Sequence, residues 1–264
     1  MENFGSVNPL FYVTLLCWLW LLQLPSSAPV YSEASLVNAA SQTTDRFAPN
    51  SVLTLYGANL AYSTAVARPP SPPRAGWLYP ELLGGVRILV GGPFLELLFV
   101  SPTQINFRLP AGMRPANYTI QLNRESVLGP PIQIRVRDLA PELFTAPGNW
   151  LLATRPDGSL VTADTPARPG ETIVFYGTGF GATVAPSTGI QTAVNWLQHF
   201  PEFAVLVNGE PSPGLYYAGV TPGYSALYQV NFTLPAVETA NPEIRVSARG
   251  DRSREGTRLW FKPE

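Results

Sequence analysis

Gln104-Ile105-Asn106-Phe107-Arg108-Leu109-Pro110 returns further along the chain as Gln229-Val230-Asn231-Phe232-Thr233-Leu234-Pro235. Two other phrases recur in the same order: residues 49–57 return at 169–177, and Val90-Gly91-Gly92 returns as Val207-Asn208-Gly209. Because both the order and the approximate spacing are kept, the pattern indicates a duplicated module of about the size of one small domain. A duplication sets the architecture of a chain and indicates no reaction.

Short apolar runs bounded by Gly, Pro, Asn or Asp recur along both halves of the chain. Ile132–Val136 and Ile244–Ala248 alternate strictly between apolar and polar residues, the period of a half-buried strand. Asn208-Gly209 lies between two such runs and predicts a tight hairpin, because a type I′ turn needs positive φ at both central residues. Short strands with turns every 8–12 residues or so are typical of immunoglobulin-like domains. The sequence therefore predicts an all-β fold with two tandem immunoglobulin-like β-sandwiches.

We place the two predicted modules at residues 35–138 and 139–264. They meet at Asp138-Leu139-Ala140-Pro141, a joint too short to act as a flexible linker. A fixed or nearly fixed arrangement of the two sandwiches is therefore expected. A long connection in the second module, residues 186–202, has room for one short helix at 192–200.

The N-terminal segment carries an uncharged apolar run at residues 10–24. This length suits the core of a signal peptide better than a membrane span, which needs about 20 residues. Small residues that suit cleavage follow at 25–28 and again at 32–34. The first residues lack Lys and Arg, so an uncleaved anchor is the alternative. Residues 1–34 are thus predicted to be a signal peptide or an N-terminal anchor, and the protein to be secreted or at the cell surface.

Composition excludes several classes of site and partner. Cys17 is the only cysteine and lies inside the apolar run, so we expect a body without disulfides and without a thiolate metal site. The net charge is -1 and only 13% of the residues are charged. This charge balance does not indicate the basic surface that binds nucleic acid or an anionic membrane. We expect no nucleic acid partner, no cofactor and no membrane contact beyond a possible N-terminal anchor.

Several phrases follow one another in order from about Ser35 to the C-terminus. They are Leu36–Ser41, Ala48–Val52, Leu83–Val86, Val100–Phe107, Thr154–Ser159, Pro169–Glu171, Tyr176–Gly181 and Tyr228–Phe232. Together they resemble the uncharacterised Solibacter-type C-terminal domain found in secreted acidobacterial proteins. The resemblance implies an extracellular setting and no established activity. In that family the unit usually closes a longer protein, whereas here little precedes it except the predicted export signal. The modules also resemble, more distantly, the immunoglobulin-like domains of plexins and transcription factors.

No arrangement of residues predicts catalysis or metal binding. His199 is the only histidine, and one imidazole cannot supply the usual zinc triad. The glycines of Gly177–Gly181 lack the spacing of a dinucleotide loop and read as a tight turn after a strand. The candidate acids of a glycosidase pair all lie in turns or at strand ends; they are Asp157, Asp164, Glu171, Glu202 and Glu210. For the mid-strand Asn106 and Asn231, a structural hydrogen bond is favoured over a ligand-binding amide.

Aromatic residues outside the clear strands are the best candidates for a binding site. These residues are Trp77, Tyr79, Trp150, Trp196 and Tyr224. Such rings stack on sugars or anchor a protein partner, although they also cap the open ends of a core. The second module has the longer hairpin, at 220–225, and we predict Trp196, Tyr224 and Tyr228 as contact residues. The predicted function is a non-catalytic, adhesion-like interaction module that binds an extracellular protein or glycan. The alternatives are a structural spacer of the cell envelope or a glycan-active hydrolase.

Overall fold

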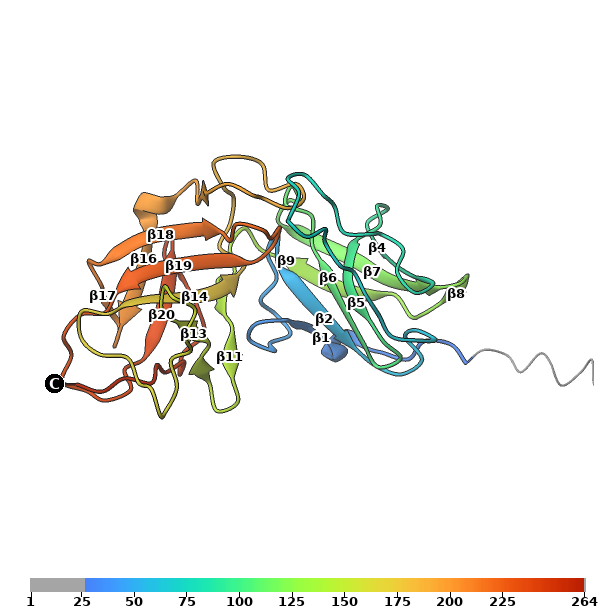
Figure 1. Ribbon diagram of the computed structural model, residues 1–264. Helices are drawn as coiled ribbons and strands as arrows, with labels where there is room; N and C mark the ends of the chain where they lie inside the picture. The colour runs from blue at the N-terminus through green and yellow to red at the C-terminus, as the bar shows by residue number, and fades with distance from the viewer. Residues whose placement is uncertain (1–26, 264) are drawn as a thin grey trace, which may run out of the picture.

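The computed structural model describes residues 27–263, which fold into two β-sandwiches placed end to end (Figure 1). Each sandwich has its own hydrophobic core. One core is built from residues between Tyr31 and Val136, and the other from residues between Leu139 and Phe261. The predicted all-β class is confirmed, and the residues of the two cores divide between Val136 and Leu139.

The first sandwich packs a sheet of order β1-β2-β6-β5-β3 against one of order β4-β7-β8, with β9 also pairing β7. Its elements are η1 (Glu33–Ser35), β1 (Leu36–Asn38), β2 (Val52–Tyr56), β3 (Ala65–Val66), β4 (Val86–Val90), β5 (Glu96–Val100), β6 (Gln104–Arg108), β7 (Ala116–Arg124), β8 (Val127–Leu128) and β9 (Ile132–Val136). All the paired strands are antiparallel. In β9 the buried residues alternate with exposed ones, as the sequence predicts for a half-buried strand.

The second sandwich has a sheet of order β10-β14-β19-β18-β15, with β13 also pairing β14, and a sheet of order β17-β16-β20-β21. Its elements are β10 (Glu142–Leu143), β11 (Thr145–Ala146), β12 (Trp150–Leu151), β13 (Ala153–Thr154), β14 (Thr172–Thr178), β15 (Asn195–Trp196), η2 (Phe200–Glu202), β16 (Phe203–Val207), β17 (Glu210–Pro211), β18 (Leu215–Val220), β19 (Tyr228–Thr233), β20 (Ile244–Ala248) and β21 (Asp251–Arg252). β11 and β12 form a separate two-stranded ribbon.

The expected helix at residues 192–200 is wrong, because this segment is tied into the sheet. Strand β15 pairs with β18, and the buried side chain of Asn195 holds the neighbouring segment. Its Nδ2 donates to the carbonyl oxygen of Ala185 (3.1 Å), and its Oδ1 accepts from the Ala185 N–H (3.0 Å). These partners lie ten or more residues away in the sequence. The residue pattern within 192–200 therefore does not reveal that they hold this segment in the sheet. A single 3₁₀ turn begins only at Phe200.

The N-terminal boundary of the first module differs from the expected residue 35. Val30 bridges Ala58, and Tyr31 is buried in the core with its hydroxyl accepting from the Leu122 N–H (2.9 Å). Cleavage after Ala34 would remove Tyr31 from the core, so of the two predicted cleavage regions the earlier one fits the fold. The apolar run and Cys17 lie outside the described residues. Within residues 27–263 no helix is both long and apolar enough to cross a membrane.

The two sandwiches are joined by direct contacts as well as by the chain. The N–H of Val52, in the first module, donates to Thr178 Oγ1 in the second (3.2 Å), and Arg46 pairs with the buried Glu142. Gly179 lies in this contact with a φ of 73°, and a Cβ there would come within 2.2 Å of the Ala140 carbonyl oxygen. Glycine after β14 therefore allows the backbone to pass close to Ala140 at the junction.

Candidate functional site

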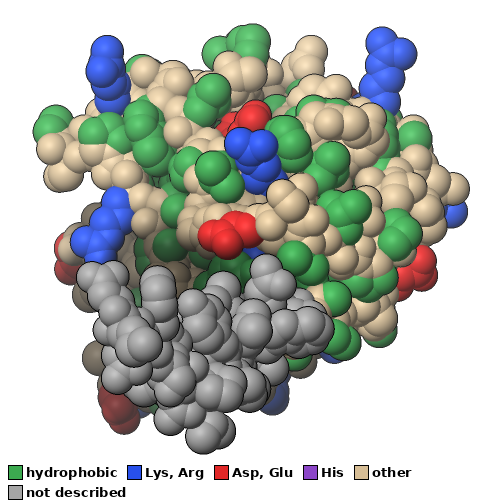
Figure 2. All heavy atoms as spheres, turned by 90° about the vertical axis from the view of Figure 1, so that its right-hand side faces the viewer, with side chains coloured by type: hydrophobic (Ala, Val, Ile, Leu, Met, Phe, Trp, Pro, Cys, Tyr) green, Lys and Arg blue, Asp and Glu red, His purple; other side chains and the backbone are tan. Residues whose placement is uncertain are grey.

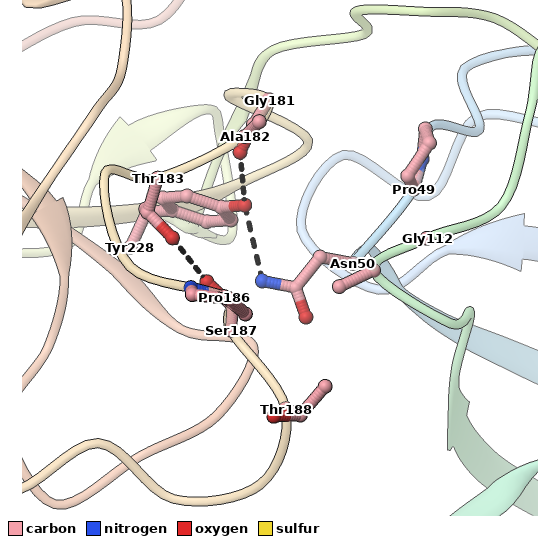
Figure 3. A pocket seen from close by; sticks show the side chains of 11 residues that line it. Pro49, Asn50, Gly112, Gly181, Ala182, Thr183, Pro186, Ser187, Thr188 and Tyr228 are labelled. Carbon is pink, nitrogen blue, oxygen red and sulfur yellow. Dashed lines mark hydrogen bonds between the residues drawn. The ribbon is translucent and has the colours of Figure 1, made fainter.

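A cavity of about 210 Å³ lies between the two modules (Figure 3). It is lined from the first module by Pro49, Asn50, Ala111 and Gly112 and from the second by Gly181, Ala182, Thr183, Pro186, Ser187, Thr188 and Tyr228. The hydroxyl of Tyr228 donates to the Gly181 carbonyl oxygen (2.6 Å) and accepts from Asn50 Nδ2 (3.0 Å). Burial raises the pKa of Tyr228 to about 12, so the hydroxyl stays protonated and keeps its donor role.

The network at this cavity continues into the first module. Arg108 is 5% exposed, and its Nη1 donates to Asn50 Oδ1 (2.9 Å) and to the Ser187 carbonyl oxygen (3.1 Å). Its Nη2 pairs with Glu96. A chain of charge-assisted and neutral hydrogen bonds thus runs from Glu96 through Arg108 and Asn50 to Tyr228. Apart from Arg108 Nε, which is buried without a hydrogen-bond partner, these groups satisfy one another, so the residues around the cavity form a structural joint between the modules.

Tyr228, predicted as a contact residue, lies in the interior. Its ring is 0% exposed and packs 5.2 Å from the ring of Phe180. The side chain comes from the core-facing side of β19, where Tyr228, Val230 and Phe232 are buried in alternation with Gln229 and Asn231. In this structure Tyr228 holds the junction together and has no exposed ring surface for a ligand.

His199 lies in a second junction cleft beside Asp138, Glu202 and Arg249. Arg249 reaches both carboxylates, at 3.7 Å from Asp138 and 3.8 Å from Glu202. Burial, together with the charge of Arg249, lowers the pKa of His199 below its usual 6.5, while the two acids oppose this shift. Within residues 27–263 no group of three or more His, Cys, Asp or Glu side chains is arranged to hold a metal ion.

This arrangement makes the stability of the protein depend on pH. Because the pKa of His199 is lower in the folded state, the unfolded chain takes up the proton first as the pH falls below 6.5. We expect the melting temperature to fall as the pH drops through this range, and to fall less in His199→Gln. Equal pH profiles of the two proteins, measured by thermal unfolding, would show that His199 does not contribute.

The most distinctive exposed ring of the second module belongs to Trp196 on the edge strand β15. It is 38% exposed, and two edge-to-face contacts hold it, with Tyr217 at 4.9 Å and Phe200 at 4.8 Å. The exposed Val184 donates its N–H to the Trp196 carbonyl oxygen (2.9 Å) and extends the apolar edge. A ring fixed on both sides loses little conformational entropy when a ligand covers it.

Cross-strand pairing sets a row of residues beside Trp196 on the outer face of the sheet. Trp196 pairs with Gly219, Gly219 with Gln229, and Gln229 with Tyr176. In the adjacent row Tyr217 pairs with Asn231, and Gln229 Nε2 donates to Asn231 Oδ1 (2.8 Å). We call the surface formed by Tyr176, Trp196, Gln229 and Asn231 the Trp196 face; Tyr217, only 8% exposed, supports the Trp196 ring.

The first module repeats only part of this surface. Tyr56 pairs with Gln104, and Gln104 Nε2 donates to Asn106 Oδ1 (2.9 Å), as in the second module. The edge strand β3, however, carries only Ala65 and Val66. The amide pair is therefore present in both sandwiches, but among the described residues only the second has a tryptophan beside it.

The structure separates the three predicted contact residues. Tyr224, 48% exposed, bridges Gln191 on the same ribbon that pairs Trp196 with Gly219. It lies five residues along from Gly219, beyond a tight turn in which its N–H donates to the Thr221 carbonyl oxygen (3.1 Å). There it neighbours the first module, because Gly223 beside it packs at Pro73. Trp196 and Tyr224 thus lie on one ribbon but not in one patch.

Sequence reasoning missed Tyr176 and Gln229 as members of the surface, and Tyr217 as the ring that supports Trp196. The alternation of β19 was the available signal, since it puts Gln229 and Asn231 on the same face. The positions of Tyr176 and Tyr217 follow from pairing between β14, β19 and β18, which a single sequence does not show.

On the part of the first module's end that the structure describes, charged side chains form no extended patch (Figure 2). Figure 2 shows Lys and Arg lying singly among hydrophobic and other side chains, on the part of this end that the structure describes. A nucleic acid site would need basic residues gathered on one face. The picture agrees with the near-zero net charge.

No protein family model matches the chain, and no curated protein is similar to it in sequence. Among solved structures it is similar to the surface glycan-binding protein SGBP-B of Bacteroides ovatus in complex with a mixed-linkage heptasaccharide. That match has 13% identity and a TM-score of 0.36, and it covers 83% of this chain and 44% of that one. The glycan-binding protein PbSGBP-B of Prevotella bryantii is similar at 12% identity and a TM-score of 0.25, over 88% of this chain and 42% of that one.

The tandem immunoglobulin repeats of Dlar are also similar, at 12% identity and a TM-score of 0.20, over 83% of this chain and 94% of that one. By contrast, the chain spans less than half of the length of the two glycan-binding proteins named above. The immunoglobulin-like class predicted from the sequence is confirmed. Because these TM-scores are below 0.5, the likenesses carry nothing about a ligand.

Proposed function

We propose that the protein is an exported, non-catalytic binding module whose contact surface is the Trp196 face. The observation that carries the proposal is Trp196 itself, a large ring left partly exposed while Tyr217 and Phe200 hold it in place. Tryptophan is the residue that most often contributes strongly to binding when it sits on a well-packed surface. The predicted export signal and the Solibacter-type resemblance belong to the same proposal and agree with a partner outside the cell.

The alternatives are less well supported by the described residues. A spacer has no use for a braced, exposed tryptophan, which costs solubility. A glycan hydrolase needs two acids flanking a sugar. Asp138 and Glu202 line one cleft at the junction, but Arg249 is paired with both of them.

Trp196→Ala tests the proposal. We expect binding to fall more than tenfold, because losing a central tryptophan anchor costs about 2 kcal/mol or more. The measurement is binding of the exported protein to arrayed extracellular glycans and to extracellular proteins, with the melting temperature recorded for each variant. Leu128→Ala, which removes an apolar side chain more exposed than Trp196 from the first module, is the control and should bind normally. Unchanged binding by Trp196→Ala would refute the site.

A further inference from the structure

The strands that form the Trp196 face contain no charged residue at all. β14, β15, β18 and β19 lack Asp, Glu, Lys and Arg along their full lengths. The matching strands of the first module differ, because β5 carries Glu96 and β6 carries Arg108. A ligand with carboxylate or sulfate groups would lose its hydration over this face and find no cation in return.

The polar groups of the face suit hydroxyls. The bond from Gln229 to Asn231 uses one donor and one acceptor of the two amides. The remaining side-chain N–H groups of Gln229 and Asn231 and the side-chain carbonyl oxygen of Gln229 belong to the same strand, β19. Together they offer both hydrogen-bond donors and acceptors. A sugar hydroxyl can donate and accept at once, so a paired amide of this kind satisfies neighbouring hydroxyls without any charge.

The apolar groups of the face suit the ring of a sugar. Tyr217 is only 8% exposed; it lies over Gly219, its hydroxyl donates to the Val220 carbonyl oxygen (2.6 Å), and its ring supports the exposed ring of Trp196. Trp196 and Tyr176 are three strand spacings apart, about 14 Å. That distance accommodates a chain of linked sugars and exceeds the length of a single ring.

We propose that the ligand of the Trp196 face is an uncharged glycan chain that lies across β15, β18, β19 and β14. A sugar ring contacts Trp196, and the hydroxyls of the neighbouring sugars bond to Gln229 and Asn231. This inference rests on the proposed function and adds the chemical class of the ligand.

The experiment measures binding of the exported protein to four soluble polysaccharides. A β-glucan and a galactomannan are neutral, and polygalacturonate and chondroitin sulfate are anionic. We expect binding to at least one neutral polymer, with a Kd that does not change with salt, because no ion pairs form. Trp196→Ala should weaken this binding more than tenfold, and Gln229→Ala with Asn231→Ala should weaken it about tenfold.

The first module supplies a matched control. Gln104→Ala with Asn106→Ala removes the same hydrogen-bonded pair from a sheet without the tryptophan, and it should leave the affinity unchanged. Its melting temperature also shows what the loss of such a pair does to folding. If both double variants weaken binding equally, the amides do not mark the site.

The outcomes separate this inference from the proposed function. Salt-sensitive binding to an anionic polymer, or Trp196-dependent binding to proteins alone, would overturn the neutral-glycan assignment and leave the binding module intact. Binding that Trp196→Ala does not affect, to any of these partners, would overturn both.

Discussion

Arg108→Ala lowers the free energy of unfolding by about 3–5 kcal/mol, the usual cost of removing one partner from a buried ion pair. Arg108 is 5% exposed, and its loss removes the ion-pair partner of Glu96 and the donor to Asn50 Oδ1 and to the Ser187 carbonyl oxygen. Because Asn50 and Ser187 belong to different modules, the variant should also loosen the junction. We expect calorimetry to show one transition for the wild type and two for Arg108→Ala.

Two variants make this result specific. Arg155→Ala breaks the more exposed pair with Glu171, within the second module, and should cost no more than about 1 kcal/mol. Arg108→Met with Glu96→Gln removes both charges and should recover much of the lost stability. A loss in Arg108→Ala no larger than that in Arg155→Ala would mean that water satisfies the junction network.

The architecture could be predicted from the sequence because it depends on local periodicity. The strict alternation of Ile132–Val136 and Ile244–Ala248 reports the burial of every second side chain, and both segments are strands with alternating burial. Asn208, at the predicted hairpin turn, has a φ of 51°, and Gly209 has a φ of 86°. These features are set by residues close in the chain, where a single sequence is informative.

The candidate site was harder to predict because long-range pairing builds it. Trp196 was predicted as a contact residue, but its place on an edge strand depends on β18 and on the hydrogen bonds of Asn195. The link between Arg108 and the Ser187 carbonyl oxygen joins two modules through residues that are far apart in the chain, and it depends on Asn50 as the second acceptor of the same Nη1. The second repeat has Thr233 and Gly170 at the matching positions, so the repeat itself does not reveal the junction.

Tyr228 shows where the available signal was weighted wrongly. Its aromatic character suggested a contact residue. The alternation of apolar and polar residues along 228–233 instead predicts a core position, because Tyr228 lies on the same face as Val230 and Phe232. The structure follows the periodicity. Where a strand pattern and residue type disagree, the pattern reports burial more directly, because it reflects the geometry of the backbone.

The last prediction follows from that burial. Tyr228→Ala should lower the free energy of unfolding by about 3–5 kcal/mol, because it empties a fully buried aromatic site beside Phe180. Tyr228→Phe keeps the ring and should cost about 1–3 kcal/mol, since Asn50 Nδ2 and the Gly181 carbonyl oxygen lose their shared partner. Denaturant unfolding gives both values, and the same samples are tested for binding. If Tyr228 acts as a structural residue, the affinity of folded Tyr228→Phe equals that of the wild type. Weakened binding with unchanged stability would instead make the junction cavity part of the binding site.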